Sequence, residues 1–216
     1  MSYEAPVIET VKKRSQIEVA HLQDEIIDIV YSLTDDIVLH GGTAIWRCYS
    51  GKRFSEDLDF YSKSFPRLLP LFQDTIKSHG LSIQNMKDTG NVIFSGIRNN
   101  SATVNVEINH VSDIEGTHIL YQLADGSSME ILSLTPDEFA EEKILAYNNG
   151  RYILDLYDIY HIVISCELKE ETVKTLRGFI QELKSPVDEP VLRTIVYQGL
   201  APSLDNMKGT ILRRIK

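Results

Sequence analysis

Two aspartates that lie two residues apart are the feature of this sequence that most clearly suggests chemistry. They are Asp57 and Asp59 in the stretch RFSEDLDF, residues 53–60. The alternation in DLDFY predicts a strand over residues 57–61, and side chains two apart on a strand project from the same face. Two like charges held together need a counter-ion, and Mg²⁺ suits them because it takes hard oxygen ligands and commonly bridges carboxylates to phosphates. The pattern therefore predicts a divalent-metal site, with Mg²⁺ or Mn²⁺ as the cofactor.

A third carboxylate lies in the stretch VNVEINH, residues 104–110. The alternation there predicts a strand with Val104, Val106 and Ile108 on one face. Glu107 then projects from the opposite face with its polar neighbours, and it is a candidate third metal ligand. The alternative is that these acidic side chains are only the solvated side of half-buried strands, as a bare DxD pattern usually is.

A pair of glycines precedes the aspartates in the stretch LHGGTAIW. Residues 37–40 (IVLH) predict a short buried strand, and a helix is expected to begin at Thr43, whose hydroxyl suits an N-cap. A turn at Gly41 and Gly42 offers close backbone approach, unpaired N–H groups and the positive end of a helix dipole, which suit a triphosphate. The alternative is a tight strand-to-helix corner. Together, the turn and the acidic pair predict a site for a metal–nucleotide complex.

The segment HGGTAIWRCYSGKRFSEDLDF resembles the opening signature of the AbiEii/AbiGii toxin-type nucleotidyltransferases, members of the DNA polymerase β-like nucleotidyltransferase superfamily. In that family a GG[ST] turn is followed by RxSxDLDF. The resemblance implies a nucleotide-cradling turn, an RxS element and a metal-binding pair. The residues on these three features are, in that order, Gly41, Gly42 and Thr43; Arg53 and Ser55; and Asp57 and Asp59.

A second element of the family is similar to EEKILAYNNGRYILDLYDIY. The matching residues are Lys143, Ala146, Arg151, Asp155 and Asp158, whereas Leu154 replaces an arginine that is common in the family. Lys143 is expected to lie on a helix and to bind a β- or γ-phosphate, and the alternative is a surface lysine beside helix-stabilising glutamates. Asp158 is expected to position substrate, to accept a proton from the attacking hydroxyl, or to hold Arg151 in an ion pair.

The rest of the chain predicts an α+β fold. Residues 1–134 are expected to form a nucleotidyltransferase-like half, with a helical segment over 8–31 and a mixed β-sheet with flanking helices. From Pro136 the apolar periodicity becomes helical, which predicts a C-terminal helical bundle over residues 135–216. The strands are expected in LSIQNM, NVIFSGI, ATVNVEINH, THILYQLA and SMEILSL.

Composition limits the classes of partner. The net charge of −9 argues against broad, sequence-independent adhesion to nucleic acid, which depends on neutralising phosphates. No stretch approaches the roughly 20 apolar residues of a membrane helix, and the first residues lack the apolar core of a signal peptide. Cys48 and Cys166 lie in no metal-binding spacing. We expect a cytoplasmic protein that has no membrane partner.

The leading hypothesis is a Mg²⁺-dependent nucleotidyltransferase that moves a nucleoside monophosphate from an NTP to an acceptor hydroxyl. The resemblance implies the toxin of a toxin–antitoxin pair, with a cognate antitoxin and with RNA, such as a tRNA 3′ end, or a protein as acceptor. One alternative is a non-catalytic nucleotide-binding or partner-binding module on the same fold. Another is a different DxD enzyme, such as a sugar-nucleotide transferase.

Overall fold

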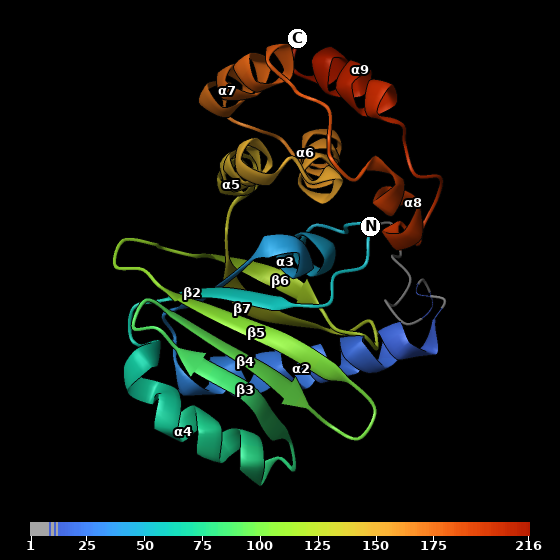
Figure 1. The fold of residues 1–216 in the computed structure, drawn as a ribbon. Helices are drawn as coiled ribbons and strands as arrows, with labels where there is room; N and C mark the ends of the chain where they lie inside the picture. The colour runs from blue at the N-terminus through green and yellow to red at the C-terminus, as the bar shows by residue number, and fades with distance from the viewer. Residues whose placement is uncertain (1–8, 10, 12) are drawn as a thin grey trace. The chain divides into compact units, whose positions relative to one another are not determined.

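The computed structural model describes Glu9, Val11 and residues 13–216, and this part of the chain forms two compact units (Figure 1). The first unit contains the residues up to Cys48 together with Phe54–Ser133, and the second contains Tyr49–Arg53 and Leu134–Lys216. The short segment 49–53 thus belongs with the helical second unit, although the segments on either side of it belong to the first. No pattern in the sequence indicates this excursion. The helix predicted over residues 8–31 begins outside the described residues.

The first unit is built on a seven-stranded mixed sheet with the strand order β3-β4-β5-β2-β1-β7-β6, counted over the described residues. The α+β prediction is confirmed, and each predicted strand is present. β1 pairs antiparallel with β2 and parallel with β7, and β2 pairs parallel with β5. The strands are β1 Ile37–His40, β2 Leu58–Ser62, β3 Ser82–Asp88, β4 Val92–Arg98, β5 Thr103–His110, β6 Thr117–Gln122 and β7 Ser128–Ser133.

Helices α2 (Arg14–Leu33) and α4 (Phe65–Ser78) pack against the sheet. Both helices lie against β5, whose residues Val104, Val106 and Ile108 are each at most 2% exposed. The alternation predicted for β5 is therefore confirmed, and its polar side chains face away from this core. The remaining helix of this unit is α3, Gly41–Cys48.

The second unit is helical. Thr135 and Glu138 form a capping box at the start of α5, because each side chain accepts a hydrogen bond from the other residue's backbone N–H. The apolar core includes Leu156, Ile159 and Leu176, all fully buried. The helices are α5 Pro136–Gly150, α6 Ile153–Ser165, α7 Glu170–Gln181, the 3₁₀ turn η1 Glu189–Val191, α8 Leu192–Ile195 and α9 Leu204–Arg214.

One helical prediction in this unit is wrong in extent. The segment EPVLRTIVYQGL, residues 189–200, forms only η1 and the single turn α8. Helix α8 stops because Val196 is extended, with φ −72° and ψ 111°, and it forms an isolated antiparallel bridge with Arg53.

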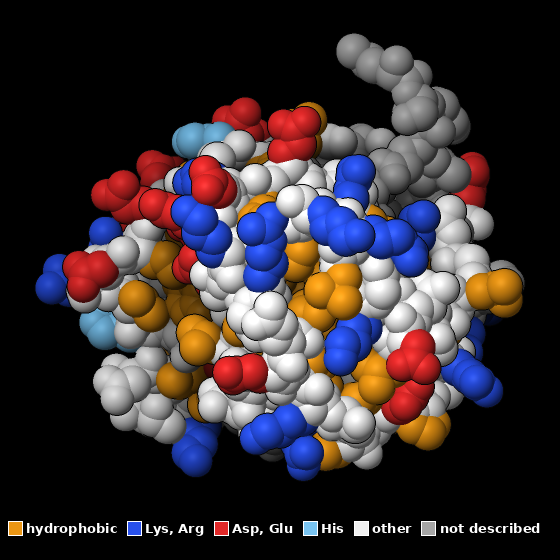
Figure 2. All heavy atoms as spheres, turned by 90° about the horizontal axis from the view of Figure 1, so that it is seen from above, with side chains coloured by type: hydrophobic (Ala, Val, Ile, Leu, Met, Phe, Trp, Pro, Cys, Tyr) orange, Lys and Arg blue, Asp and Glu red, His pale blue; other side chains and the backbone are white. Residues whose placement is uncertain are grey.

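The described helices include none that is both long enough and apolar enough to cross a membrane. Figure 2 shows Lys and Arg side chains on one face of the molecule, interrupted by acidic, polar and apolar side chains. This face is therefore not a continuous basic surface, in keeping with the acidic net charge of the chain.

Candidate active site

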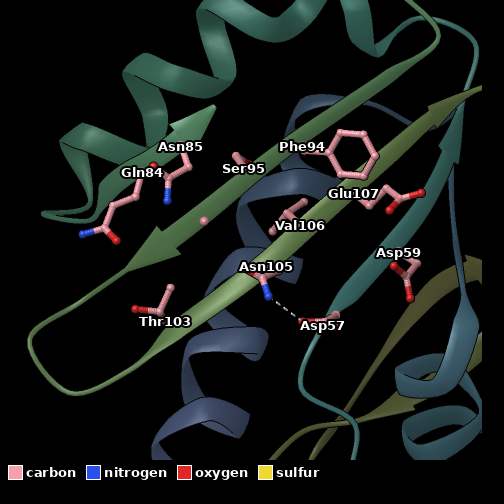
Figure 3. Close-up of a pocket in the computed structure, with 11 residues that line it drawn as sticks. Asp57, Asp59, Gln84, Asn85, Phe94, Ser95, Thr103, Asn105, Val106 and Glu107 are labelled. Atoms are coloured by element: carbon pink, nitrogen blue, oxygen red, sulfur yellow. Dashed lines mark hydrogen bonds between the residues drawn. The ribbon is translucent and has the colours of Figure 1, made fainter. Parts of the chain in front are cut away.

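The three predicted carboxylates lie on one face of the sheet in the first unit. Asp59 of β2 is directly paired with Glu107 of the parallel neighbour β5. Asp57 directly precedes β2, and it is exposed, whereas Asp59 and Glu107 are half-buried. Leu58 and Phe60, which alternate with the aspartates, are fully buried. The alternation therefore presents Asp57, Asp59 and Glu107 away from the core (Figure 3).

The glycine turn lies against Asp59. Gly41 has φ +73°, a left-handed conformation that side chains rarely adopt. A Cβ built on Gly41 would overlap the carboxylate oxygen Oδ2 of Asp59 and would lie 3.1 Å from its Cγ. Glycine is thus required here both by the backbone conformation and by the approach of the carboxylate. Gly42 is buried in the helix and does not have a positive φ.

The expectation that Thr43 caps the helix is wrong. Helix α3 begins two residues earlier, at Gly41, directly after β1. Thr43 is fully buried, and its hydroxyl donates a hydrogen bond of 2.5 Å to the backbone carbonyl of Asp57. The threonine therefore fixes the start of β2 to α3, which sets the position of the acidic pair.

A glutamine that sequence reasoning missed supports the same loop. Gln23 on α2 is fully buried, and its Nε2 donates to the backbone carbonyl of Ser55 over 3.0 Å. The same nitrogen lies 3.5 Å from the Thr43 hydroxyl. Ser55 itself is half-buried. In the sequence, Gln23 stands out only as a polar residue on the apolar face of a helix, and this position does not indicate which residue it would bind.

The donor chemistry of the carboxylate face fits a hard divalent cation. Asp57 and Asp59 offer oxygen ligands on one face, and Mg²⁺ is typically held by one or two carboxylates together with waters and substrate phosphates. The described residues contain no group of three or more His, Cys, Asp or Glu side chains arranged to hold a metal ion. Asp57 instead accepts a hydrogen bond from Asn105 over 3.0 Å, and Glu107 accepts one from Asn109 over 2.9 Å. Among the described residues, the three carboxylates therefore form no closed cage around a metal ion.

A hollow of about 400 Å³ opens beside these carboxylates over β5, β4 and β3. Figure 3 shows its polar and aromatic side chains around the exposed face of the sheet. Its lining includes Asp57, Asp59, Gln84, Asn85, Phe94, Gly96, Thr103, Asn105 and Glu107.

In the second unit, the arginine of the RxS element pairs with the second family element. Arg53 donates to Asp158 through two nitrogens, Nε to Oδ1 and Nη2 to Oδ2, each over 2.6 Å. Lys143 lies 3.1 Å from Asp155 Oδ1 and 3.2 Å from Asp158 Oδ2. Arg53, Lys143 and Asp158 are 7%, 8% and 1% exposed. Two motifs about a hundred residues apart in the sequence thus form one buried ionic network.

This network rules out two of the alternatives considered for these residues. Lys143 is not an exposed helix lysine, because burial and two carboxylates enclose it. Asp158 does not hold Arg151, because its ionic partners are Arg53 and Lys143. Arg151 is exposed and forms the left-handed C-cap of α5, with φ 53°. Leu154, at the position where the family commonly has arginine, packs against the apolar core of this unit.

The charges in the network reinforce one another. Burial acts to raise the pKa of Asp158, but Arg53 and Lys143 outweigh it and hold this pKa below its usual value. Burial acts to lower the pKa of Lys143, and Asp158 and Asp155 more than reverse that effect. Burial raises the pKa of Asp155, with Lys143 opposing it in part. Asp158 is therefore an ionised carboxylate with both oxygens engaged, which makes it a poor proton acceptor.

Backbone carbonyls of the segment 49–53 are held by two residues that belong to no family motif, His161 and Tyr197. His161 Nε2 lies 2.7 Å from the carbonyl oxygen of Tyr49. The Tyr197 hydroxyl donates to the Gly51 carbonyl over 2.9 Å, and the Tyr197 N–H donates to the Lys52 carbonyl over 3.2 Å. These contacts fix the segment that carries Arg53. Both His161 and Tyr197 lie in stretches with helical periodicity, and that pattern does not indicate these hydrogen bonds.

Solved structures of other proteins have a similar fold. The fold is similar to that of MenT4, a nucleotidyltransferase toxin from Mycobacterium tuberculosis, with a TM-score of 0.65 at 18% identity over 93% of this chain and 82% of that one. It is also similar to JHP933 from Helicobacter pylori, with a TM-score of 0.64 at 20% identity over 94% of this chain and 90% of that one. A search of curated protein sequences finds no significant match.

Residues 29–194 match the family described as "Nucleotidyl transferase AbiEii toxin, Type IV TA system". This match includes the glycine turn, the carboxylates and the ionic network, so the resemblance drawn from the motifs is confirmed. The chain belongs to the AbiEii nucleotidyl transferase toxin family and is a nucleotidyltransferase.

Proposed function

We propose that the protein transfers a nucleoside monophosphate from an NTP to a hydroxyl of an RNA acceptor. A bond forms between the acceptor oxygen and the α-phosphorus, and the bond from that phosphorus to the bridging oxygen of the β-phosphate breaks. Pyrophosphate leaves with the electron pair, and the proton of the hydroxyl passes to solvent. The observation that carries the proposal is the Asp59–Glu107 pair beside a glycine turn that leaves no room for a Cβ.

The residues of the first unit have distinct roles in this proposal. The turn at Gly41 and Gly42 binds the triphosphate through backbone N–H groups at the start of α3, where the helix dipole favours negative charge. Asp57 and Asp59, with Glu107 as a further ligand, would hold Mg²⁺ or Mn²⁺. When bound, such a cation neutralises charge on the reacting phosphates. Thr43 and the Ser55 backbone position the acidic pair through their hydrogen bonds.

The residues of the second unit act as a charged, pre-ordered group. Asp158 and Asp155 orient Arg53 and Lys143 through ion pairs. The proposed role of these two basic residues is to assist NTP binding. Positioning is the role best supported for Asp158, since its lowered pKa and its two cationic partners argue against proton transfer. Arg151, which is exposed and takes no part in this ionic network, contributes to substrate binding at most through its own charge.

Membership of a type IV toxin–antitoxin family implies a cognate antitoxin and a nucleotide substrate. In this proposal the protein is the toxin of such a pair, acts in the cytoplasm, and modifies RNA, of which a tRNA 3′ end is one form. The similarity in fold to MenT4, which is a nucleotidyltransferase toxin, supports this assignment by analogy.

The experiment is a transfer assay with four α-³²P-labelled NTPs, Mg²⁺ and a mixture of total RNA and cell protein. Label recovered in RNA, and absent with Asp59→Asn, supports the proposal. Equilibrium binding of NTP without transfer to any acceptor would instead support a non-catalytic nucleotide-binding module.

A further inference from the structure

One row of directly paired residues crosses the sheet beside the carboxylates. Asp59 of β2 pairs with Glu107 of β5, Glu107 pairs with Phe94 of β4, and Phe94 pairs with Lys87 of β3. Neighbouring strands lie about 4.8 Å apart, so Phe94 is about one strand spacing from Glu107 and about two from Asp59. This is a span that one nucleotide bridges between its hydroxyl and its base.

The hollow over these strands exists because a glycine forms its floor. Gly96 pairs with Asn105 on one side and with Gln84 on the other, in the middle of a row of larger side chains. A Cβ built on Gly96 would meet its nearest neighbours, the Gln84 carbonyl oxygen and the Thr103 methyl, at 3.5 and 3.6 Å, which are ordinary contacts. Neither the backbone conformation nor a clash therefore requires glycine at this position, and its lack of a side chain keeps the hollow deep.

The part of the hollow over β4 and β3, beyond the carboxylates, suits a flat, neutral group with hydrogen-bonding edges. Phe94 is 39% exposed, and Figure 3 shows its ring at one end of the hollow beside Glu107. Gln84, Asn85 and Asn105 bring amides, and Asn85 lies at a β-bulge with φ 53°, a feature that re-aims a side chain. The described lining residues include no lysine or arginine. Exposed aromatic rings with amides are the surfaces on which proteins stack and read unpaired nucleobases.

The direction of the reaction distinguishes the two substrates. In phosphoryl transfer the attacking and leaving oxygens lie roughly in line on opposite sides of the phosphorus. The Gly41 turn, where the leaving pyrophosphate is proposed to bind, follows β1, on one side of Asp59. The hollow over β4 and β3 lies on the other side of Asp59, beyond Glu107. The attacking hydroxyl is therefore expected from the side of the hollow.

We infer that this hollow is the acceptor subsite and that it holds an unpaired nucleobase at the reacting end of an RNA. The inference rests on the proposed function and specifies its acceptor. Phe94 stacks on the base, and the amides of Gln84 and Asn85 contact its edge. Lys87 and Arg98 belong to the same face, because they pair directly with Phe94 and Thr103, and they contact neighbouring phosphates of the RNA.

The test measures transfer of label to RNA and NTP affinity on the same variants. Gly96→Val fills the hollow with a residue that strands favour. We expect the NTP dissociation constant and the thermal midpoint to stay near wild type, with transfer to RNA lowered at least tenfold. Phe94→Ala is expected to raise the KM for RNA about fivefold to hundredfold, as loss of one base–aromatic stack implies, and Phe94→Trp to restore it.

Leu120→Ala is the matched control, because Leu120 is a 62% exposed apolar residue on β6, at the opposite edge of the same sheet. It should leave KM for RNA unchanged. Wild-type transfer to RNA that Phe94→Ala and Gly96→Val do not alter would overturn the subsite while leaving the proposed function in place. Transfer to protein instead of RNA would also overturn the subsite. Absence of any transfer by the wild-type protein would overturn the proposed function and the subsite with it.

Discussion

Gly41→Ala perturbs the turn in two ways that can be separated. The first is backbone strain, because alanine in the left-handed conformation at φ +73° costs about 1–2 kcal/mol. Restriction of the unfolded chain recovers about 0.4–1 kcal/mol, so the net loss of stability is about 1 kcal/mol. For a chain of this size that lowers the thermal midpoint by roughly 2–4 °C.

The second effect is displacement of Asp59. The new Cβ would overlap Oδ2 of Asp59, so this carboxylate must move. A misplacement of about 1 Å at a reacting centre can lower the rate about a hundredfold. We therefore expect kcat/KM for nucleotide transfer to fall about a hundredfold, far more than the small change in stability would cause.

Gly80→Ala is the control for this experiment. Gly80 has φ +75°, almost the same backbone conformation as Gly41, but a Cβ built there meets nothing within 4 Å. It should show a similar loss of thermal stability with wild-type transfer. If Gly41→Ala also retained wild-type transfer at its lowered midpoint, the place of Asp59 against the turn would not matter for the reaction.

Three further predictions concern the second unit. Lys143→Ala removes the cation that pairs with Asp155 and Asp158, and it should lower the free energy of unfolding by about 3 kcal/mol. This value is at the low end for breaking a buried ion pair, because Asp158 keeps Arg53. Urea unfolding measures the change, and an unchanged free energy of unfolding would contradict the burial of this lysine. The pKa of Asp158 is lower in the folded state than in the unfolded chain, where it is about 3.9. Its contribution to stability is therefore present above the unfolded pKa and is lost as the pH falls through the folded pKa. The difference in free energy of unfolding between wild type and Asp158→Asn should shrink below about pH 4, and a constant difference would refute the assignment. Tyr197→Phe removes the donor to the Gly51 carbonyl and should lower the free energy of unfolding by about 1 kcal/mol, measured by urea unfolding. Tyr160→Phe on α6 is the tyrosine control, and an equal loss of stability in both variants would contradict the prediction.

Local pattern predicted the sheet well. The alternation in residues 57–61 and 104–110 identifies β2 and β5, because each has one face in the core and the other outside it. It also correctly puts Asp57, Asp59 and Glu107 on one face. The pairing of Asp59 with Glu107 needs the parallel register of two strands that are distant in sequence, and no local pattern contains that information.

The errors arise where long-range contacts decide the outcome. Thr43 has the chemistry of an N-cap, but a left-handed Gly41 allows α3 to begin directly after β1, and the hydroxyl then binds Asp57. Lys143 has the polar neighbours of a surface helix, but Asp155 and Asp158 on the next helix bury and pair it. In both cases the partner lies more than ten residues away in the sequence.

The central claim is tested most directly by measuring transfer of an α-labelled nucleotide to RNA by wild type and by Asp59→Asn, with NTP, Mg²⁺ and RNA at saturating concentrations. Asp59 is half-buried at the exposed face of β2, so the isosteric amide should leave the thermal midpoint within a few degrees of wild type. The account predicts label in RNA with the wild-type protein and a loss of at least a hundredfold with Asp59→Asn. Equal transfer by the two folded proteins would contradict it.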